Sequence, residues 1–383
     1  YFARNFLDLG TRQEKTRRDT YRLVAGIRGK FNGDWRYEAS ANFAEVKTRT
    51  KIIGNVNMQR YLLAIDSVRD PATGQIVCRS RLNPAVARAL ESARDPLVAA
   101  STLAGDVAAC TPLNPFGEGN ISDAAARYIL TDSMTRSKLT QFDFNAFVSG
   151  DSSDWFELPG GPVGFALGLE YRRERFRSAQ DKIVEAGLTF YTPTPAFDPP
   201  AFEVKELFGE ISLPLLANRT FFKELTVNAA ARLADYKGST GTVVAWNAGA
   251  EWAPVSDIRF RVNYATAVRA PNLVEVYEPS SQKYSAGLIT DPCSVQNIGA
   301  GAASRAANCR AAGVPVGFDK TYLTSFPYQF SGNRDLREES SKSFTAGLIL
   351  QPRRIPGLAL SIDYYDIKVD NVITSPEIQQ VLN

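Results

Sequence analysis

The sequence predicts an all-β fold, the wall of a transmembrane antiparallel β-barrel with about eleven strands and long external loops that contain short helices. Three observations predict it. Hydrophobic and polar residues alternate with a period of two along many segments. These segments are roughly ten residues long or longer, as a tilted strand that crosses a bilayer requires. The connections between them alternate between short turns and long loops.

The composition excludes several other classes of protein. Hydrophobic residues make up 44% of the 383, with no run near the ~20 apolar residues that a membrane-spanning helix needs. The 44 basic and 41 acidic residues are scattered, so we expect no nucleic-acid partner. Histidine, the commonest general base and metal ligand, is absent, and no C-x-x-C spacing occurs. We therefore expect no enzymatic activity, no cofactor and no metal site.

The alternation divides each segment into two chemically different faces. In 21–31, one face carries Tyr21, Leu23 and Ile27, whereas the other carries Arg22 and Arg28. A soluble β-sandwich also alternates, but its strands usually have 5–6 residues. We therefore expect the apolar face to contact lipid and the polar face to line a wet interior. The same pattern recurs at 35–44, 141–148, 163–172, 225–233, 244–252, 258–265, 343–351 and 357–367.

This geometry makes a specific prediction for individual side chains. Phe144, Trp246 and Leu360 should point outward, and Gln141, Asn247 and Ser361 should point inward.

Loop lengths provide an independent test of the barrel. When the strands are counted alternately, the long connections at about 50–136, 178–202 and 269–338 fall on one side. The other side has short turns, as bacterial barrels do. A first strand near 2–8 brings the count to about eleven, whereas single-chain bacterial barrels use even numbers. Residues 378–383 are polar rather than strand-like, so we expect 1–383 to be part of a larger barrel.

Two segments match sequence motifs of a known protein family. Residues 261–273 (RVNYATAVRAPNL) are similar to the family's Y-S-x-A-V-R-A-P-N-L stretch. Residues 336–367, with LREESSKSFTAG, PGL and DYYDI, are similar to its L-x-P-E-x-S-x-S-x-T-x-G … P-G-L … D-Y-Y-x-I block. Glu338 stands where many members have proline. Through these two segments the chain resembles the barrels of TonB-dependent receptors.

The resemblance implies a 22-stranded barrel in the outer membrane of a Gram-negative bacterium. It also implies an N-terminal plug domain and a TonB box, both missing from this sequence together with the closing strands. The external loops would bind a scarce solute, such as a siderophore, cobalamin or an oligosaccharide, for import. Implied partners are outer-membrane lipid and, through the missing N-terminal region, TonB with its inner-membrane energising complex. The alternatives are a passive porin-like barrel without TonB coupling and a secreted β-rich binding protein.

The four cysteines form two pairs, each within one long loop. Cys78 and Cys110 lie in the first, and Cys293 and Cys309 lie in the last. Local disulfides would restrict these loops in an oxidising compartment. Free thiols and pairing between the loops are the alternatives.

Four aromatic residues near the end of the last long loop are candidate ligand contacts: Tyr322, Phe326, Tyr328 and Phe330. Aromatic rings at a receptor mouth stack on flat ligands, although they also pack loop against loop. The alanine-rich stretch 83–109 has helical spacing and predicts one or two short helices over the barrel mouth, as a folded loop rather than a functional lid.

Five residues could be assigned binding or catalytic roles, but we interpret each of them as structural. Arg269, Pro271 and Asn272 match the family motif, but here the proline should end a strand and the asparagine should start the turn into the loop. Asp363 and Asp366 are three residues apart on a predicted strand and therefore on opposite faces, which argues against an acid–base pair.

Overall fold

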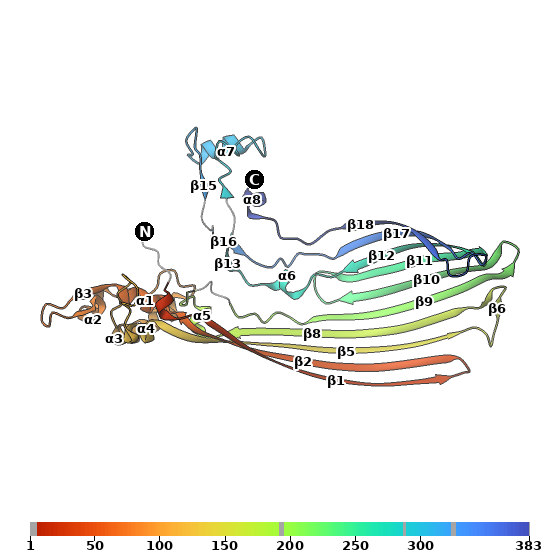
Figure 1. The fold of residues 1–383 in the computed structure, drawn as a ribbon, viewed down its shortest axis with the longest axis horizontal. Helices are drawn as coiled ribbons and strands as arrows, with labels where there is room; N and C mark the ends of the chain where they lie inside the picture. Colours follow the sequence, from red (N-terminus) through yellow and green to blue (C-terminus); the bar gives the residue numbers. More distant parts are fainter. Residues whose placement is uncertain (1–5, 191–194, 286–288, 323–326, 383) are drawn as a thin grey trace.

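The computed structural model describes residues 6–190, 195–285, 289–322 and 327–382 and contains one ten-stranded antiparallel sheet (Figure 1). Neighbouring strands in the sheet follow one another in sequence order, so the chain runs up and down without crossovers. The strands are β1 (Gln13–Phe31), β2 (Trp35–Val56), β5 (Leu130–Asp151), β8 (Gly164–Gln180), β9 (Phe202–Arg219), β10 (Phe222–Tyr236), β11 (Gly241–Val255), β12 (Ile258–Arg269), β17 (Glu339–Leu350) and β18 (Leu360–Asp370).

The connections contain short elements. Among them are four two-stranded ribbons: β3 (Ser67–Arg69) with β4 (Ile76–Cys78), β6 (Glu157–Leu158) with β7 (Gly161–Pro162), β13 (Ser281–Tyr284) with β16 (Pro327–Phe330), and β14 (Ile289–Thr290) with β15 (Thr321–Tyr322). The helices are η1 (Leu7–Leu9), α1 (Met58–Ile65), α2 (Arg79–Leu82), η2 (Pro84–Val86), α3 (Pro96–Ala109), α4 (Asp123–Ile129), α5 (Lys182–Glu185), α6 (Leu273–Tyr277), α7 (Arg305–Ala311) and α8 (Ile378–Leu382). No helix in the described ranges is long and apolar enough to cross a membrane.

The strand expected near 2–8 does not join the sheet in the described residues. Residues 1–5 lie outside the described ranges, and Leu7–Leu9 form the 3-10 helix η1. Gly10 follows with a φ of 78°, a left-handed value that interrupts an extended chain. The sheet therefore has one strand fewer than the eleven predicted.

Cross-strand pairing keeps the two predicted faces separate across the whole sheet. Phe144 lies opposite Tyr171, and Leu207 lies opposite both Leu169 and Leu233. We call this the outer face; it also carries Trp246 and Leu360, whereas the alternating residues form the inner face, with Gln141, Asn247 and Ser361.

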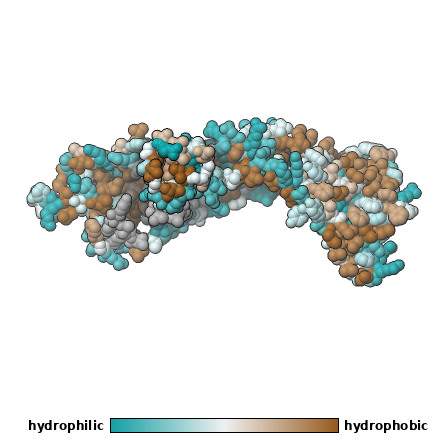
Figure 2. Space-filling view, turned by 90° about the horizontal axis from the view of Figure 1, so that it is seen from above, coloured by the Kyte–Doolittle hydropathy of each residue, from teal (hydrophilic) through white to brown (hydrophobic). Residues whose placement is uncertain are grey.

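The outer face is apolar but has little protein over it. Leu23 is 70% exposed and Ile27 is 67% exposed, although both sit in the middle of β1. Figure 2 shows hydrophobic residues gathered toward the end of the molecule that carries the short turns. A surface of this kind is unfavourable in water, so the fold needs a nonpolar medium against its outer face.

Aromatic rings on the outer face lie at two levels along the strands. Near the short turns, the Trp35 ring contacts Trp155 at 5.4 Å and Phe165 at 4.8 Å between centroids. Further along the strands, Trp246 lies 5.5 Å from Tyr264. Such rows are typical of the two girdles that border the apolar band of a membrane barrel.

All three long connections lie at one end of the sheet, which we call the loop end, and the opposite end is the turn end (Figure 1). The loops span 57–129, 181–201 and 270–338. The first is shorter than the predicted 50–136 because β2 and β5 continue to pair as far as Val56 and Leu130. The alternation of short and long connections in the sequence therefore correctly predicts that the long loops lie at one end of the sheet.

Candidate functional site

The first loop, 57–129, folds around its own hydrophobic core at the loop end. The core contains Leu63, Tyr128 and Ile129 together with the Cys78–Cys110 disulfide, and Ile129 and Cys78 are completely buried. The local pairing predicted for these cysteines is therefore present. The disulfide joins the end of β4 to the residue that follows α3.

A buried carboxylate connects the helices of this loop. Asp106 on α3 accepts hydrogen bonds from Gln59 Nε2 at 2.8 Å and from Arg60 Nε at 2.7 Å, both on α1. The hydroxyl of Tyr128 on α4 donates to the backbone carbonyl of Asp106 at 2.7 Å. Burial raises the pKa of the Tyr128 hydroxyl, and the charge of Asp106 raises it further. These satisfied polar contacts fix the relative positions of the helices.

The short helices predicted within 83–109 are present as η2 and α3, although residues 87–95 between them are not helical. Helix α3 begins at Pro96, where the side chain of Asp95 accepts hydrogen bonds from the backbone N–H groups of Leu97 and Val98. Before Pro96, this stretch contains only the short 3-10 helix η2. Leu90 is buried as the spacing suggests, whereas Leu97 is 81% exposed.

The second loop, 181–201, docks on the first. The Met58 N–H donates to the Leu188 carbonyl at 2.7 Å, and the Phe190 N–H donates to the Val56 carbonyl at 2.7 Å. Leu188 is fully buried in a cluster that includes Leu90 and Ala99 of the first loop. The two loops therefore cover the ends of β2, β5 and β8 together.

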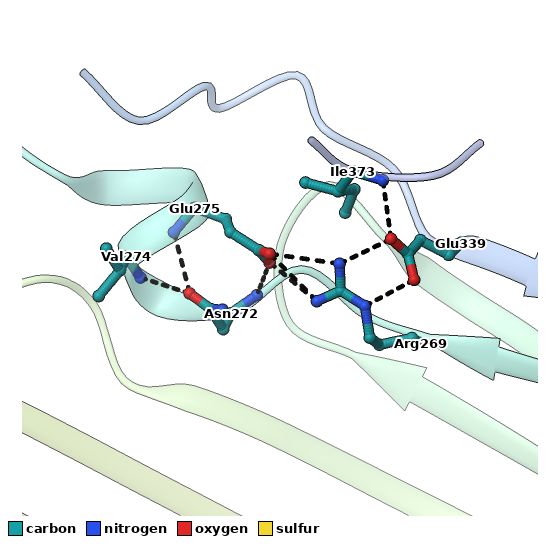
Figure 3. Close-up of polar contacts among 6 residues, drawn as sticks. All are labelled: Arg269, Asn272, Val274, Glu275, Glu339 and Ile373. Atoms are coloured by element: carbon teal, nitrogen blue, oxygen red, sulfur yellow. Dashed lines mark hydrogen bonds and ion pairs between the residues drawn. The ribbon is translucent and has the colours of Figure 1, made fainter. Parts of the chain in front are cut away.

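The third loop, 270–338, is held at its base by an arginine clamp (Figure 3). Arg269 at the end of β12 contacts Glu275 on α6 at 3.0 Å and Glu339 at the start of β17 at 2.7 Å. Glu339 also accepts a hydrogen bond from the Ile373 N–H at 2.7 Å. One guanidinium thus joins both ends of the loop, and its planar geometry suits two carboxylates at once.

Asn272 has a different structural role from the predicted one. Rather than starting a turn, it is the N-cap of α6, and its side chain accepts from the N–H groups of Val274 and Glu275. Glu275 accepts from the Asn272 N–H in return, which completes a capping box. Pro271 lies between the last residue of β12 and this cap. The N-x-x-E spacing is the sequence signal that could have identified Glu275.

We expect an Arg269→Gln variant to loosen the base of the third loop. Glu275 and Glu339 would lose their shared cation, so the loop should become several times more sensitive to limited proteolysis while the sheet stays folded. Arg269→Lys should show an intermediate rate because lysine keeps the charge but not the planar fork. Equal proteolysis of all three proteins would contradict the clamp.

The candidate aromatic residues do not form one cluster in the described residues. Tyr322 belongs to the β14–β15 ribbon, whereas Tyr328 and Phe330 belong to the β13–β16 ribbon. Phe326 lies outside the described residues. Lys283 sits over the Phe330 ring at 3.6 Å from its centroid, a cation–π contact within the ribbon. The second disulfide, Cys293–Cys309, also forms within this loop as predicted.

A cavity of about 500 Å³ lies where the third loop meets the second loop and β8. Three aromatic rings line it, Phe176 from β8, Phe197 from the second loop and Tyr284 from β13, together with charged Lys283 and Glu278. Phe176 and Phe197 are 5.7 Å apart between centroids. Sequence reasoning missed this site because its walls come from three separate segments. The local signal is Phe176, an aromatic residue on the inner face near the loop end, opposite Leu139 on β5.

Ion pairs cover the inner face below this cavity. Arg232 on β10 pairs with Glu170 on β8 at 3.2 Å and with Glu206 on β9. Arg261 on β12 pairs with Asp363 on β18 at 2.7 Å. Charged side chains on the inner face are consistent with a wet interior.

Asp363 and Asp366 lie on opposite faces, as their spacing predicts. Asp363 is opposite Gly347 on the inner face, whereas Asp366 is opposite Phe344 on the outer face. Within the described ranges, no three or more histidine, cysteine, aspartate or glutamate side chains are grouped as metal ligands would be.

Comparisons with known proteins identify the family. A family model described as "TonB dependent receptor-like, beta-barrel" matches residues 2–383. No curated protein matches the chain.

Several solved structures are similar to the chain at low identity. The siderophore receptor PirA from Pseudomonas aeruginosa is 12% identical with a TM-score of 0.41, over 92% of this chain and 46% of that chain. The RagAB peptide importer is 10% identical with a TM-score of 0.45, over 92% and 30%. The ferric enterobactin receptor PfeA from P. aeruginosa, as a mutant, is 14% identical with a TM-score of 0.42, over 93% and 35%.

The chain thus spans less than half the length of each of these proteins. The family match, by contrast, covers almost the whole chain. This chain belongs to the TonB-dependent receptor-like β-barrel family.

Proposed function

We propose that the chain is part of the barrel of an outer-membrane receptor. This receptor would bind a scarce solute at its external loops and import it by TonB-dependent transport. The observation that carries the proposal is the position of the loops. All three long loops gather at one end of a wall whose outer face is apolar and whose inner face is charged. In this arrangement, a solute can bind at the loops and then pass along the hydrated inner face.

The proposal extends to parts that this sequence does not contain. A 22-stranded barrel would enclose a plug domain, and a TonB box ahead of the plug would contact TonB and its inner-membrane energising complex. Residues 1–383 would supply part of the wall and the three long external loops. Residues Tyr322, Phe326, Tyr328 and Phe330 remain candidate ligand contacts.

The cavity between the second and third loops is the part of this mouth best suited to an aromatic or ring-shaped solute. Its three rings offer stacking surfaces, and Lys283 and Glu278 add charges of both signs. A siderophore, cobalamin or an oligosaccharide presents a flat or ring-shaped surface of this kind.

Uptake experiments separate a TonB-dependent receptor from a passive porin. In cells that produce the whole receptor, import should stop when TonB is removed or when the proton-motive force is collapsed. A passive porin would continue to equilibrate the solute under both conditions. Import that is unaffected by either treatment would refute the proposed coupling.

We expect Phe197→Ala to weaken solute binding by roughly 10-fold or more, because one stacked ring is worth about 1–3 kcal/mol in comparable aromatic recognition. Binding to the purified receptor can be measured by titration calorimetry with candidate siderophores, cobalamin and oligosaccharides. Phe116→Ala is the matched control, since Phe116 is 66% exposed on the first loop and does not line the cavity. Equal losses in both variants would exclude the cavity as the binding site.

A further inference from the structure

A second cavity, of about 520 Å³, lies on the inner face where β2, β5 and β8 approach the loop end. Most of its lining side chains are neutral and polar, with hydroxyl or amide groups that both donate and accept hydrogen bonds. Those from β2, β5, β8 and the second loop are Thr50, Asn55, Ser133, Thr135, Gln180 and Thr189. We call these six residues the hydroxyl–amide site.

Strand register arranges part of this site in a row across the sheet. Thr50 on β2 lies opposite both Thr16 on β1 and Thr135 on β5, and Thr135 also lies opposite Gln180 on β8. The hydroxyl oxygens of Thr16 and Thr50 are 3.0 Å apart and form a hydrogen bond. Side chains on one face of neighbouring strands project in the same direction, so the row presents its polar groups side by side.

The second loop closes the cavity with Thr189, which the structure holds in a fixed position. Thr189 forms a β-bridge with Asn57, between the backbone hydrogen bonds that Leu188 and Phe190 make to the first loop and β2. Its side chain is only 3% exposed, and its Oγ1 has no hydrogen-bond partner among the described residues. A buried hydroxyl without a partner is unfavourable, so this atom suits a polar group that enters the cavity.

The hydroxyl–amide site adjoins the first cavity, which is lined by Phe176, Phe197 and Tyr284. Gln180 lines the second cavity, whereas Ser178 and Phe176 on the same face of β8 line the first. At about 3.3 Å per residue, Phe176 and Gln180 are roughly 13 Å apart along the strand. A single elongated solute can therefore contact the aromatic rings and the hydroxyl–amide site together.

The charges in the two cavities balance. In the first, Lys283 forms an ion pair with Glu278 at 3.0 Å, and in the second, Arg12 and Glu14 add one charge of each sign. A strongly anionic solute, such as an iron chelate, needs an excess of cations in its site. A neutral sugar has apolar ring faces that stack on aromatic rings, and its hydroxyls both donate and accept hydrogen bonds. The lining therefore favours the sugar.

We propose that the two cavities together bind a neutral oligosaccharide, which stacks on Phe176 and Phe197 and places its hydroxyls against the hydroxyl–amide site. The inference rests on the proposed function, because it names the class of solute that the receptor binds. The distance between the rings and Gln180 requires a ligand of more than one sugar ring. Thr189 Oγ1 would gain its missing partner from a hydroxyl of the bound sugar.

The test begins with the whole receptor, purified in a detergent without a sugar headgroup and applied to an array of neutral oligosaccharides. The affinity for the oligosaccharide that binds best is then measured by titration calorimetry. Ferric enterobactin, an anionic iron chelate, and cyanocobalamin are the comparison solutes. We expect an oligosaccharide to bind and neither comparison solute to bind at the same concentration.

Two threonine variants test the position of the bound sugar. Thr189→Val removes the unpaired hydroxyl but keeps the shape of the side chain, and it should weaken binding roughly fivefold. Thr135→Val/Thr189→Val should weaken it roughly 25-fold if the two hydroxyls act independently. The matched control is Thr140→Val, because Thr140 is also on β5 but faces outward, opposite Glu45 and Arg175. This control should bind as the unchanged receptor does.

Three outcomes would overturn the inference: no oligosaccharide on the array binds, a comparison solute binds as tightly as the best sugar, or Thr140→Val loses as much affinity as Thr189→Val. Heat-dependent migration in detergent gels checks that each variant is folded. The two proposals fail separately. Sugar binding with uptake that continues without TonB overturns only the proposed coupling, whereas TonB-dependent uptake of another solute without sugar binding overturns only this inference.

Discussion

We expect Ala229→Arg to destabilise the folded barrel by about 2–4 kcal/mol and Ala230→Arg to change its stability by less than about 1 kcal/mol. The two alanines are consecutive on β10 but face opposite ways. Ala229 lies between Ile211 and Ala248 on the outer face, at a level between the rings of Trp246 and Trp252 on the neighbouring strand. A guanidinium there enters hydrocarbon, which is costly near the middle of a bilayer.

Ala230 provides the control because only the direction of the side chain differs. It lies between Glu210 and Asn247 on the inner face, where a guanidinium stays hydrated and has a carboxylate within reach. Reversible unfolding of the whole receptor from lipid vesicles in urea gives both free energies of unfolding. A larger loss for Ala230→Arg than for Ala229→Arg would show that the two faces have been assigned the wrong way round.

The second large effect is expected in the first loop. A Cys78→Ser/Cys110→Ser variant should lower the stability of the folded loop 57–129 by about 3–4 kcal/mol, because a disulfide that closes a segment of about 33 residues restricts the unfolded loop by this amount. Backbone amides of α1 and α3 should then exchange with solvent roughly 100-fold faster or more, as measured by hydrogen–deuterium exchange.

The sheet supplies the internal reference for this experiment. Amides in β10 and β11 pair only with each other and with neighbouring strands, so their exchange should not change. A Cys293→Ser/Cys309→Ser variant should leave α1 and α3 protected, because that disulfide lies in the third loop. Unchanged exchange in α1 and α3 after loss of Cys78–Cys110 would mean that Asp106 and the hydrophobic core hold this loop without the disulfide.

Some parts of the candidate site could be predicted from the sequence because their signals are local. The two disulfides join cysteines only 32 and 16 residues apart, so local pairing was the simplest prediction. The prediction that the strand ends at Pro271 needed only the known preferences of proline, whereas Asn272 is the N-cap of α6 and not the start of a turn. The short helices predicted within 83–109 are present, but Leu90 and Ala93 lie between them and are buried against Leu188 of another loop, which helical spacing could not show.

Sequence alone determined which side chains share a face and which connections share an end. Both follow from the extended backbone, in which successive side chains point to opposite sides and successive strands reverse direction. Only the tertiary structure decided that Thr16, Thr50 and Thr135 stand in one row, that Arg269 joins Glu275 to Glu339, and that Phe176, Phe197 and Tyr284 line one cavity. A periodic pattern and a tight turn fix the face of a side chain and the register of a hairpin. They do not fix the pairing of strands joined by a long loop or the docking of loops, which depend on contacts between residues far apart in the chain.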